Sequence, residues 1–124
     1  MDCVRDAKEK GYKKILIFED DIIVDKNSNK LFPKIINEIG DDWDLLYLGG
    51  DYRENNITFQ LSSYALDSKV FDYLLGNREE SGLEDDYFFI EFVQKKFETY
   101  RATPMIMWQS KVDTDIQVLK ENMV

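Results

Sequence analysis

The chain has 124 residues, a formal net charge of −9, no histidine and a single cysteine. This length fits one hydrophobic core, so we treat residues 1–124 as a single domain. The acidic balance argues against nucleic acid as a partner, and the absence of histidine excludes Ser-His and Cys-His nucleophile systems and imidazole-based zinc sites.

The hydrophobic residues, 44% of the chain, are spread over many short runs. These runs are far shorter than the ~20 apolar residues that a membrane-spanning helix needs. Residues 1–6 lack the apolar stretch of a secretory signal peptide, and one cysteine cannot form an internal disulfide. We therefore expect a cytoplasmic chain with no membrane span.

The N-terminal part of the chain predicts a helix followed by a strand. Val4 and Ala7 lie three residues apart in a polar stretch and predict a short amphipathic helix over residues 2–10. Residues 15–18, Ile-Leu-Ile-Phe, are continuously apolar. Such a run is typical of a strand that is covered on both faces in a parallel sheet.

The rest of the chain alternates strand-like and helix-like patterns. Strands are predicted over residues 43–48, 58–66 and 99–107, and helices over residues 31–39, 67–75 and 83–97. This alternation predicts an α/β domain with a mostly parallel sheet flanked by helices. Ligands of such sheets bind beyond the carboxyl ends of the strands.

An acidic triplet, Glu19-Asp20-Asp21, follows the first predicted strand. If the backbone stays extended, Glu19 and Asp21 project to one side and Asp20 to the other. Crowded carboxylates raise one another's pKa unless a cation neutralises them, and oxygen ligands suit Mg²⁺, Mn²⁺ or Ca²⁺. The triplet predicts a metal site that carries a diphosphate; the alternative is a set of solvated acids at a strand end.

A second acidic triplet, Glu84-Asp85-Asp86, opens the last predicted helix. Acids in the first turn of a helix are favoured by the helix dipole, so capping alone accounts for them. The functional alternative is that Asp85 or Asp86 acts as a general base on an acceptor hydroxyl. A glycine pair, Gly49-Gly50, either lets a ligand approach the backbone or makes a turn.

Three stretches together resemble glycosyltransferase family 25, which includes lipooligosaccharide and collagen galactosyltransferases. They are Ile-Leu-Ile-Phe-Glu-Asp-Asp at 15–21, Trp-Asp-Leu-Leu-Tyr-Leu-Gly-Gly at 43–50 and Ser-Tyr-Ala-Leu at 63–66. Their order and separations are also similar to the family pattern. The resemblance begins partway into the family domain, without the usual N-terminal nucleotide-binding segment.

The resemblance implies a GT-A-like, Rossmann-like fold and an inverting transfer of galactose or glucose from a UDP-sugar. The cofactor would be Mn²⁺ or Mg²⁺, and the acceptor a hydroxyl of a glycan or protein. The matching positions are Asp21 and Glu19 for the metal, Glu19, Asp20, Gly49 and Gly50 for the nucleotide-sugar, and Asp85 and Asp86 for catalysis.

Related enzymes add a C-terminal histidine to the metal shell, which this chain does not contain. Gln109, Asp113 or Asp115 would substitute for it. Two other classes stay open: a catalytically impaired remnant that serves as a sugar-nucleotide or interaction module, and a receiver-type signalling domain with Asp51 as phosphoacceptor. The receiver reading conflicts with Gly49-Gly50, which occupies the strand end where the phosphoacceptor belongs. A homo-oligomer is also left open.

Overall fold

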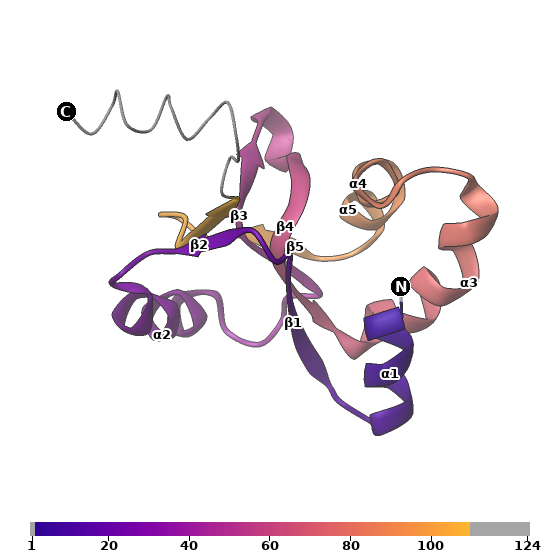
Figure 1. Cartoon of the computed structure of the whole chain (residues 1–124), viewed down its shortest axis with the longest axis horizontal. Coiled ribbons are helices and arrows are strands. Elements are labelled where there is room, and N and C mark those ends of the chain that lie inside the picture. The colour runs from indigo at the N-terminus through magenta and orange to yellow at the C-terminus, as the bar shows by residue number, and fades with distance from the viewer. Residues whose placement is uncertain (1, 110–124) are drawn as a thin grey trace.

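The structure is a computed structural model that describes residues 2–109. Its main sheet has four strands in the order β1-β4-β3-β5, and a smaller sheet pairs β2 with β6 (Figure 1). The strands are β1 (Lys14–Phe18), β2 (Ile22–Val24), β3 (Leu45–Tyr52), β4 (Thr58–Asp67), β5 (Thr99–Arg101) and β6 (Met107–Gln109). None of the helices within these residues is long and apolar enough to cross a lipid bilayer.

Helices cover both faces of the main sheet (Figure 1). The longer helices are α1 (Asp2–Lys10), α2 (Ser28–Ile39) and α3 (Phe71–Ser81). Short helical turns are η1 (Glu54–Asn56) and η2 (Ser68–Val70), and α4 (Asp85–Phe88), the π-helical η3 (Phe89–Val93) and α5 (Gln94–Lys96) follow one another without a break. α1, α3 and this last segment lie on one face, and α2 lies on the other.

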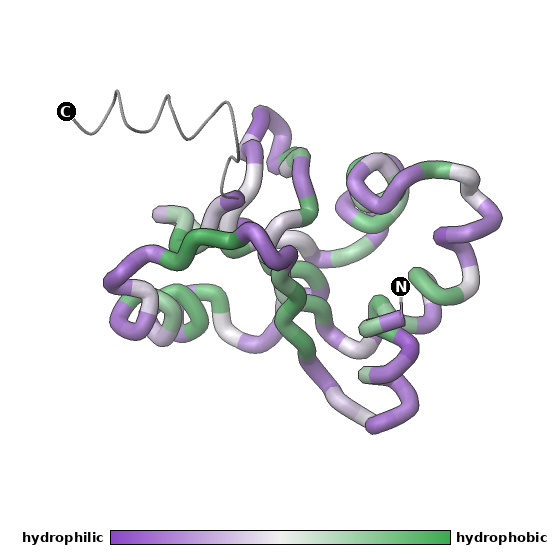
Figure 2. Tube along the Cα trace, viewed as in Figure 1, coloured by the Kyte–Doolittle hydropathy of each residue, from purple (hydrophilic) through white to green (hydrophobic). Residues whose placement is uncertain are grey.

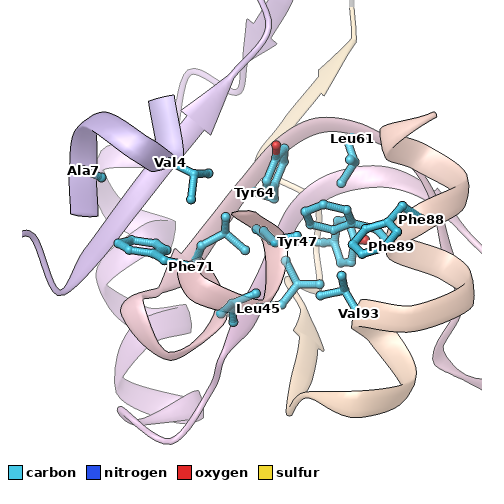
Figure 3. Packing of buried hydrophobic residues seen from close by; sticks show 13 residues of the cluster. Val4, Ala7, Leu45, Tyr47, Leu61, Tyr64, Phe71, Phe88, Phe89 and Val93 are labelled. Carbon is cyan, nitrogen blue, oxygen red and sulfur yellow. The ribbon is translucent and has the colours of Figure 1, made fainter. Parts of the chain in front are cut away.

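Alternation along β3 separates two hydrophobic clusters. Leu45 and Tyr47 belong to the cluster on the α1 and α3 face, whereas Leu46 and Leu48 belong to the cluster on the α2 face. All four side chains are fully buried, because β3 is an inner strand covered on both sides. Figure 3 shows the first cluster, in which Tyr47 packs among residues of α1, α3 and the α4–η3 segment.

The expectation of a mostly parallel sheet is wrong. β4 pairs antiparallel with both β1 and β3, and only the β3–β5 pair is parallel. Between β3 and β4 lie only residues 53–57, whereas a parallel connection needs roughly a dozen residues or more. Since β4 opposes both neighbours, β1, β3 and β5 still point in one direction, and their carboxyl ends meet at one edge of the sheet.

The expectation that residues 15–18 are buried on both faces is also wrong. β1 is an outer strand of the main sheet, and its side chains alternate between half-buried and exposed. Leu16 and Phe18 are 41% and 49% exposed. Figure 2 shows this strand as a continuous hydrophobic segment, in green, near the middle of the view. An apolar run predicts a strand from its composition, but it does not tell whether that strand has one neighbour or two.

Several predicted elements are confirmed with shifted ends. The helix over 2–10 is observed as α1, and the strand over 58–66 as β4. α2 begins earlier than predicted, at Ser28. The helix expected over 67–75 is observed as η2 followed by α3, which runs on to Ser81, and residues 85–96 replace the helix expected over 83–97. β3 does not end at its glycine pair but continues to Tyr52 through two irregularities in its pairing with β4.

Candidate functional site

The two acidic triplets, which are far apart in the sequence, come together at the carboxyl end of β1. Glu19 leaves this strand beside the start of α4, and a cavity of about 260 Å³ lies between them. Its lining residues are Ile17, Glu19, Leu61, Tyr64, Glu84, Asp85 and Asp86. The cavity is therefore bounded by four carboxylates over an apolar floor, and none of the described residues that line it is basic.

The crowding of carboxylates changes the pKa of Glu19. Partial burial raises the pKa of its carboxyl above the ordinary value, and three nearby negative charges raise the pKa further. These charges are, in decreasing order of effect, Asp21, Asp86 and Asp20. The charged form of Glu19 is thus disfavoured in the folded state, and a cation in this region would remove the penalty.

This raised pKa predicts how Glu19→Gln changes stability in metal-free buffer. The pKa of Glu19 is higher in the folded state than its ordinary value of 4.5. Its contribution to the free energy of unfolding is therefore greatest at low pH and is lost as the pH rises from 4.5 through the folded pKa. Glu19→Gln removes this loss. We expect the variant to have a higher melting temperature than wild type at neutral pH in EDTA, and the difference to shrink toward about pH 4.

The control for this experiment is Glu54→Gln, which changes an exposed glutamate in the short turn η1 and should leave the melting temperature unchanged at neutral pH and at about pH 4. Thermal unfolding followed by circular dichroism measures all three proteins. A neutral-pH melting temperature of Glu19→Gln at or below that of wild type would show that crowding of carboxylates does not destabilise the site.

Gln109 joins the first triplet to the small sheet. β6 pairs with β2 so that Gln109 lies opposite Ile22, and Ile22 is the residue that follows Asp21 in the chain. The Gln109 Nε2 group donates to Asp21 Oδ2 at 2.9 Å and to Glu19 Oε2 at 3.4 Å. Gln109 thus lies beside the acidic residues, and its place in a metal shell stays a prediction; Asp113 and Asp115 lie outside the described residues.

One carboxylate oxygen of Asp21 has no partner among the described residues. Its Oδ1 is buried and has no hydrogen-bond partner among the described residues, while its Oδ2 accepts from Gln109. A buried carboxylate oxygen without a partner is costly and calls for a ligand, an ion or water. Asp20 is exposed in the turn and contributes only its charge.

Asp85 and Asp86 have different partners, and neither caps its own helix. Asp85 accepts a short charge-assisted hydrogen bond from Arg78 Nε on α3. Asp86 Oδ1 accepts a hydrogen bond from the Leu61 backbone N–H at 3.2 Å, and no described residue donates to its other carboxylate oxygen. The residue at the N-cap position, Glu84, makes no side-chain capping bond. These residues therefore make no capping hydrogen bond, although Asp85 and Asp86 do lie in the first turn of α4, where the helix dipole favours acids.

Tyr64 is a site residue that the sequence did not single out as functional. It is 5% exposed and, among the described lining residues, only Tyr64 carries a side-chain hydrogen-bond donor. Burial raises the pKa of its hydroxyl strongly, and nearby negative charges add to this. The hydroxyl therefore stays protonated and can donate to a ligand in the cavity. Arg78 was missed as well, because its pairing with Asp85 depends on the fold of the α3–α4 connection.

Gly49 and Gly50 are explained by packing, and neither lines the acidic cavity. A Cβ on Gly49 would lie 1.6 Å from the Met107 carbonyl oxygen. Gly50 has a φ of +145°, and a Cβ there would lie 2.9 Å from Thr58 Cγ2. Both positions require glycine for backbone reasons, and their role in nucleotide-sugar binding stays a prediction.

Asp51, the residue that a receiver-type domain would phosphorylate, lies on β3 away from the acidic cavity. It accepts a hydrogen bond of 2.7 Å from Arg53, and this bond holds the pKa of its carboxyl below the ordinary value. Among the described residues, no contact joins Asp51 to the carboxylates of the first triplet. The geometry therefore gives no support to a receiver-type domain.

Within residues 2–109, no three acidic or cysteine side chains are close enough together to enclose a metal ion by themselves. A nucleotide-linked cation does not need such an enclosure, because Mg²⁺ commonly uses one or two carboxylates, several waters and the phosphates of the substrate. Asp21 with its free Oδ1 and Glu19 with its raised pKa fit this smaller requirement.

The sequence matches no protein-family model and no curated protein. The resemblance to glycosyltransferase family 25 therefore rests on the three stretches described above. What the site can do follows from its own chemistry: four carboxylates, one buried hydroxyl donor and one bridging amide at the end of a strand.

Proposed function

We propose that this chain is a metal-dependent inverting glycosyltransferase that moves galactose or glucose from a UDP-sugar to a hydroxyl acceptor. The observation that carries the proposal is the convergence of Glu19 and Glu84-Asp85-Asp86 in one cavity. One triplet supplies oxygen ligands and the other supplies a base, and inverting transfer requires both functions at adjacent points.

The donor half of the site is assigned to the first triplet. A cavity without a described basic lining residue repels a diphosphate, so a cation has to mediate its binding. Asp21 through Oδ1, and Glu19, would hold Mn²⁺ or Mg²⁺, and rotation of the Gln109 amide would present its oxygen to the same ion. When bound, the metal supplies charge stabilisation for the leaving diphosphate.

The catalytic half of the site is assigned to Asp86 in preference to Asp85. Asp85 is engaged by the Arg78 guanidinium, so one of its carboxylate oxygens is already committed to an ion pair. Asp86 is fixed by one oxygen through the Leu61 N–H, and its second oxygen is available. In the proposed reaction Asp86 takes the proton of the acceptor hydroxyl as the acceptor oxygen attacks the anomeric carbon, opposite the departing UDP.

Donor binding is tested by thermal unfolding with UDP-galactose or UDP-glucose in the presence of Mn²⁺. A ligand at 100 times its Kd adds about 2.7 kcal/mol to the free energy of unfolding, which corresponds to a shift of about 10 °C for a chain of this size. Asp21→Ala should abolish the shift, because it removes the buried Oδ1 and its partner oxygen. Asp42→Ala, which changes an exposed aspartate in the loop before β3, is the matched control and should keep it.

An unchanged melting temperature with both UDP-sugars would sink the donor-binding proposal. If the Asp21→Ala variant still shows the increase in melting temperature, the metal binds somewhere other than Asp21. A shift that needs no divalent cation would also contradict the assignment, because the described lining residues include no basic side chain that could hold a diphosphate directly.

The second candidate is a sugar-nucleotide-binding module that does not transfer sugar. The size of the cavity favours it, because about 260 Å³, below the roughly 300–1,000 Å³ typical of ligand pockets, leaves little room for an acceptor beside the donor. Mn²⁺-dependent release of UDP from either donor separates the two candidates. A module of this kind would show the melting shift and no release, whereas the proposed transferase shows both.

A further inference from the structure

The pairing of β4 with β3 is interrupted beside the acidic cavity. Gly49 pairs with Ser63 and Asp51 pairs with Phe59, so that one residue of β3 faces residues 60–62 of β4. Extra residues of this kind form a β-bulge, which bends the strand and leaves backbone groups out of the ladder. Bulges are over-represented beside active sites, where they re-aim a group. We refer to residues 60–62 as the β4 bulge.

Gln60 opens the β4 bulge in a conformation that most side chains disfavour. Its φ is +73°, in the left-handed region, and its side chain is exposed. This region suits glycine and tolerates Asn and Asp, whereas the Cβ of other residues lies too close to the following carbonyl oxygen. Opposite the bulge, a Cβ on Gly50 would lie 3.0 Å from the Phe59 carbonyl oxygen and 3.3 Å from that of Gln60. Strain of this kind persists where the surrounding structure holds it, and it is concentrated at functional sites.

Two backbone groups of the β4 bulge hold the two acidic segments. The Leu61 N–H donates to Asp86 Oδ1 at 3.2 Å. The Ser62 carbonyl accepts from the Glu19 N–H at 3.0 Å. The Leu61 side chain lines the cavity between them. In a regular inner strand the Leu61 N–H would bond to a neighbouring strand, and the bulge is what leaves it free for α4.

We infer that the β4 bulge positions the acidic site, and that the left-handed backbone of Gln60 aims the Leu61 N–H at Asp86. The adjacent residue, Ser62, fixes the backbone of Glu19, so one short segment sets the distance between the two acidic groups. Gln60 itself does not line the cavity and is a positioning residue. The expected effect on the rate rests on the proposed function, whereas the backbone contact does not.

A substitution series at position 60 tests the role of the backbone conformation. Asparagine and valine are similar in size, but asparagine tolerates a positive φ and a β-branched residue does not. Gln60→Gly and Gln60→Asn should keep the wild-type rate of Mn²⁺-dependent UDP release. Gln60→Val should lose roughly 10²-fold in kcat, the cost of a small misplacement of a reacting group. The melting shift with UDP-sugar should remain, because Asp21 is held by Gln109 and not by the bulge.

Amide hydrogen exchange followed by NMR tests the contact itself and needs no enzymatic activity. The Leu61 amide should be protected in wild type, Gln60→Gly and Gln60→Asn. It should exchange faster in Gln60→Val, and also in Asp86→Ala, which removes the acceptor. The Ala65 amide is the control within each protein, because Ala65 is paired with both β1 and β3. Its continued protection shows that β4 remains folded.

Unchanged protection of the Leu61 amide in Asp86→Ala, or in a folded Gln60→Val, would overturn the inference. An equal loss of rate in Gln60→Gly and Gln60→Val would also overturn it, because the side chain would then matter and not the backbone conformation. If wild type releases no UDP, the proposed function fails, and amide exchange alone decides the role of the bulge. If Gln60→Val does not fold, the exchange of Leu61 in Asp86→Ala and the rates of Gln60→Gly and Gln60→Asn decide it.

Discussion

Replacing Asp86 with asparagine is expected to slow Mn²⁺-dependent release of UDP from UDP-galactose or UDP-glucose by roughly 10²–10⁴-fold, the usual contribution of a general base. Asparagine keeps an oxygen that can accept from the Leu61 N–H, so the α4 segment stays in place. It cannot take a proton from the nucleophile. Donor binding, measured by the melting shift, should remain, so that the loss lies in the chemical step.

Asp85→Asn is the matched control for this variant. It has the same chemical change at the adjacent residue, but its main consequence is a weaker contact with Arg78, a partly exposed ion pair. Such pairs contribute about 0–1 kcal/mol, so we expect a small loss of stability and a smaller effect on the rate. A larger rate loss in Asp85→Asn than in Asp86→Asn would reverse the assignment of the base.

Gly49→Ala is expected to destabilise the fold by about 3 kcal/mol or more, the upper end of the cost of overpacking. The added Cβ would lie 1.6 Å from the Met107 carbonyl oxygen, and backbone cannot move aside as a flexible side chain can. The change should push β6 away from β3 and displace Gln109, at the end of β6, from Asp21. Urea unfolding measures the loss of stability.

Gly76→Ala provides the comparison, because the same substitution in the middle of α3 meets no atom within 4 Å. Alanine is favoured over glycine in a helix interior by roughly 0.5–1 kcal/mol, so this variant should be more stable than wild type. If Gly49→Ala unfolds at the same urea concentration as wild type, the close approach of β3 to β6 is not a constraint on the fold. A loss confined to UDP-sugar binding would instead support a ligand contact at Gly49.

Local patterns predicted most of the elements. The helix over 2–10 follows from the spacing of Val4 and Ala7, and β4 follows from the composition of residues 58–66. The ends were less accurate: α3 continues past Gly76 to Ser81, since a single glycine inside a helix costs only about 1 kcal/mol, and it ends where Gly82 takes a left-handed C-cap conformation with a φ of +72°. The spacing of apolar side chains indicates which residues share a face of a helix or strand, but only within a short stretch of the sequence.

The candidate site was predicted in parts. Both acidic triplets were identified from their positions at a strand end and a helix start, and Gln109 was one of three residues considered beside the first triplet. Arg78 and Tyr64 were missed as functional residues. Their roles depend on contacts across the α3–α4 connection and between strands, which leave no mark in the sequence around them.

The sequence by itself determined that the chain is acidic, lacks histidine and has clustered carboxylates at two places. Only the tertiary structure decided that Glu19 and the second triplet share one cavity, that β4 runs against its neighbours, and that the apolar strand before Glu19 is the outer strand of the main sheet. The physical reason is that residue type and spacing act locally. Strand direction, strand order and the approach of distant side chains depend on connection lengths and packing across the whole domain.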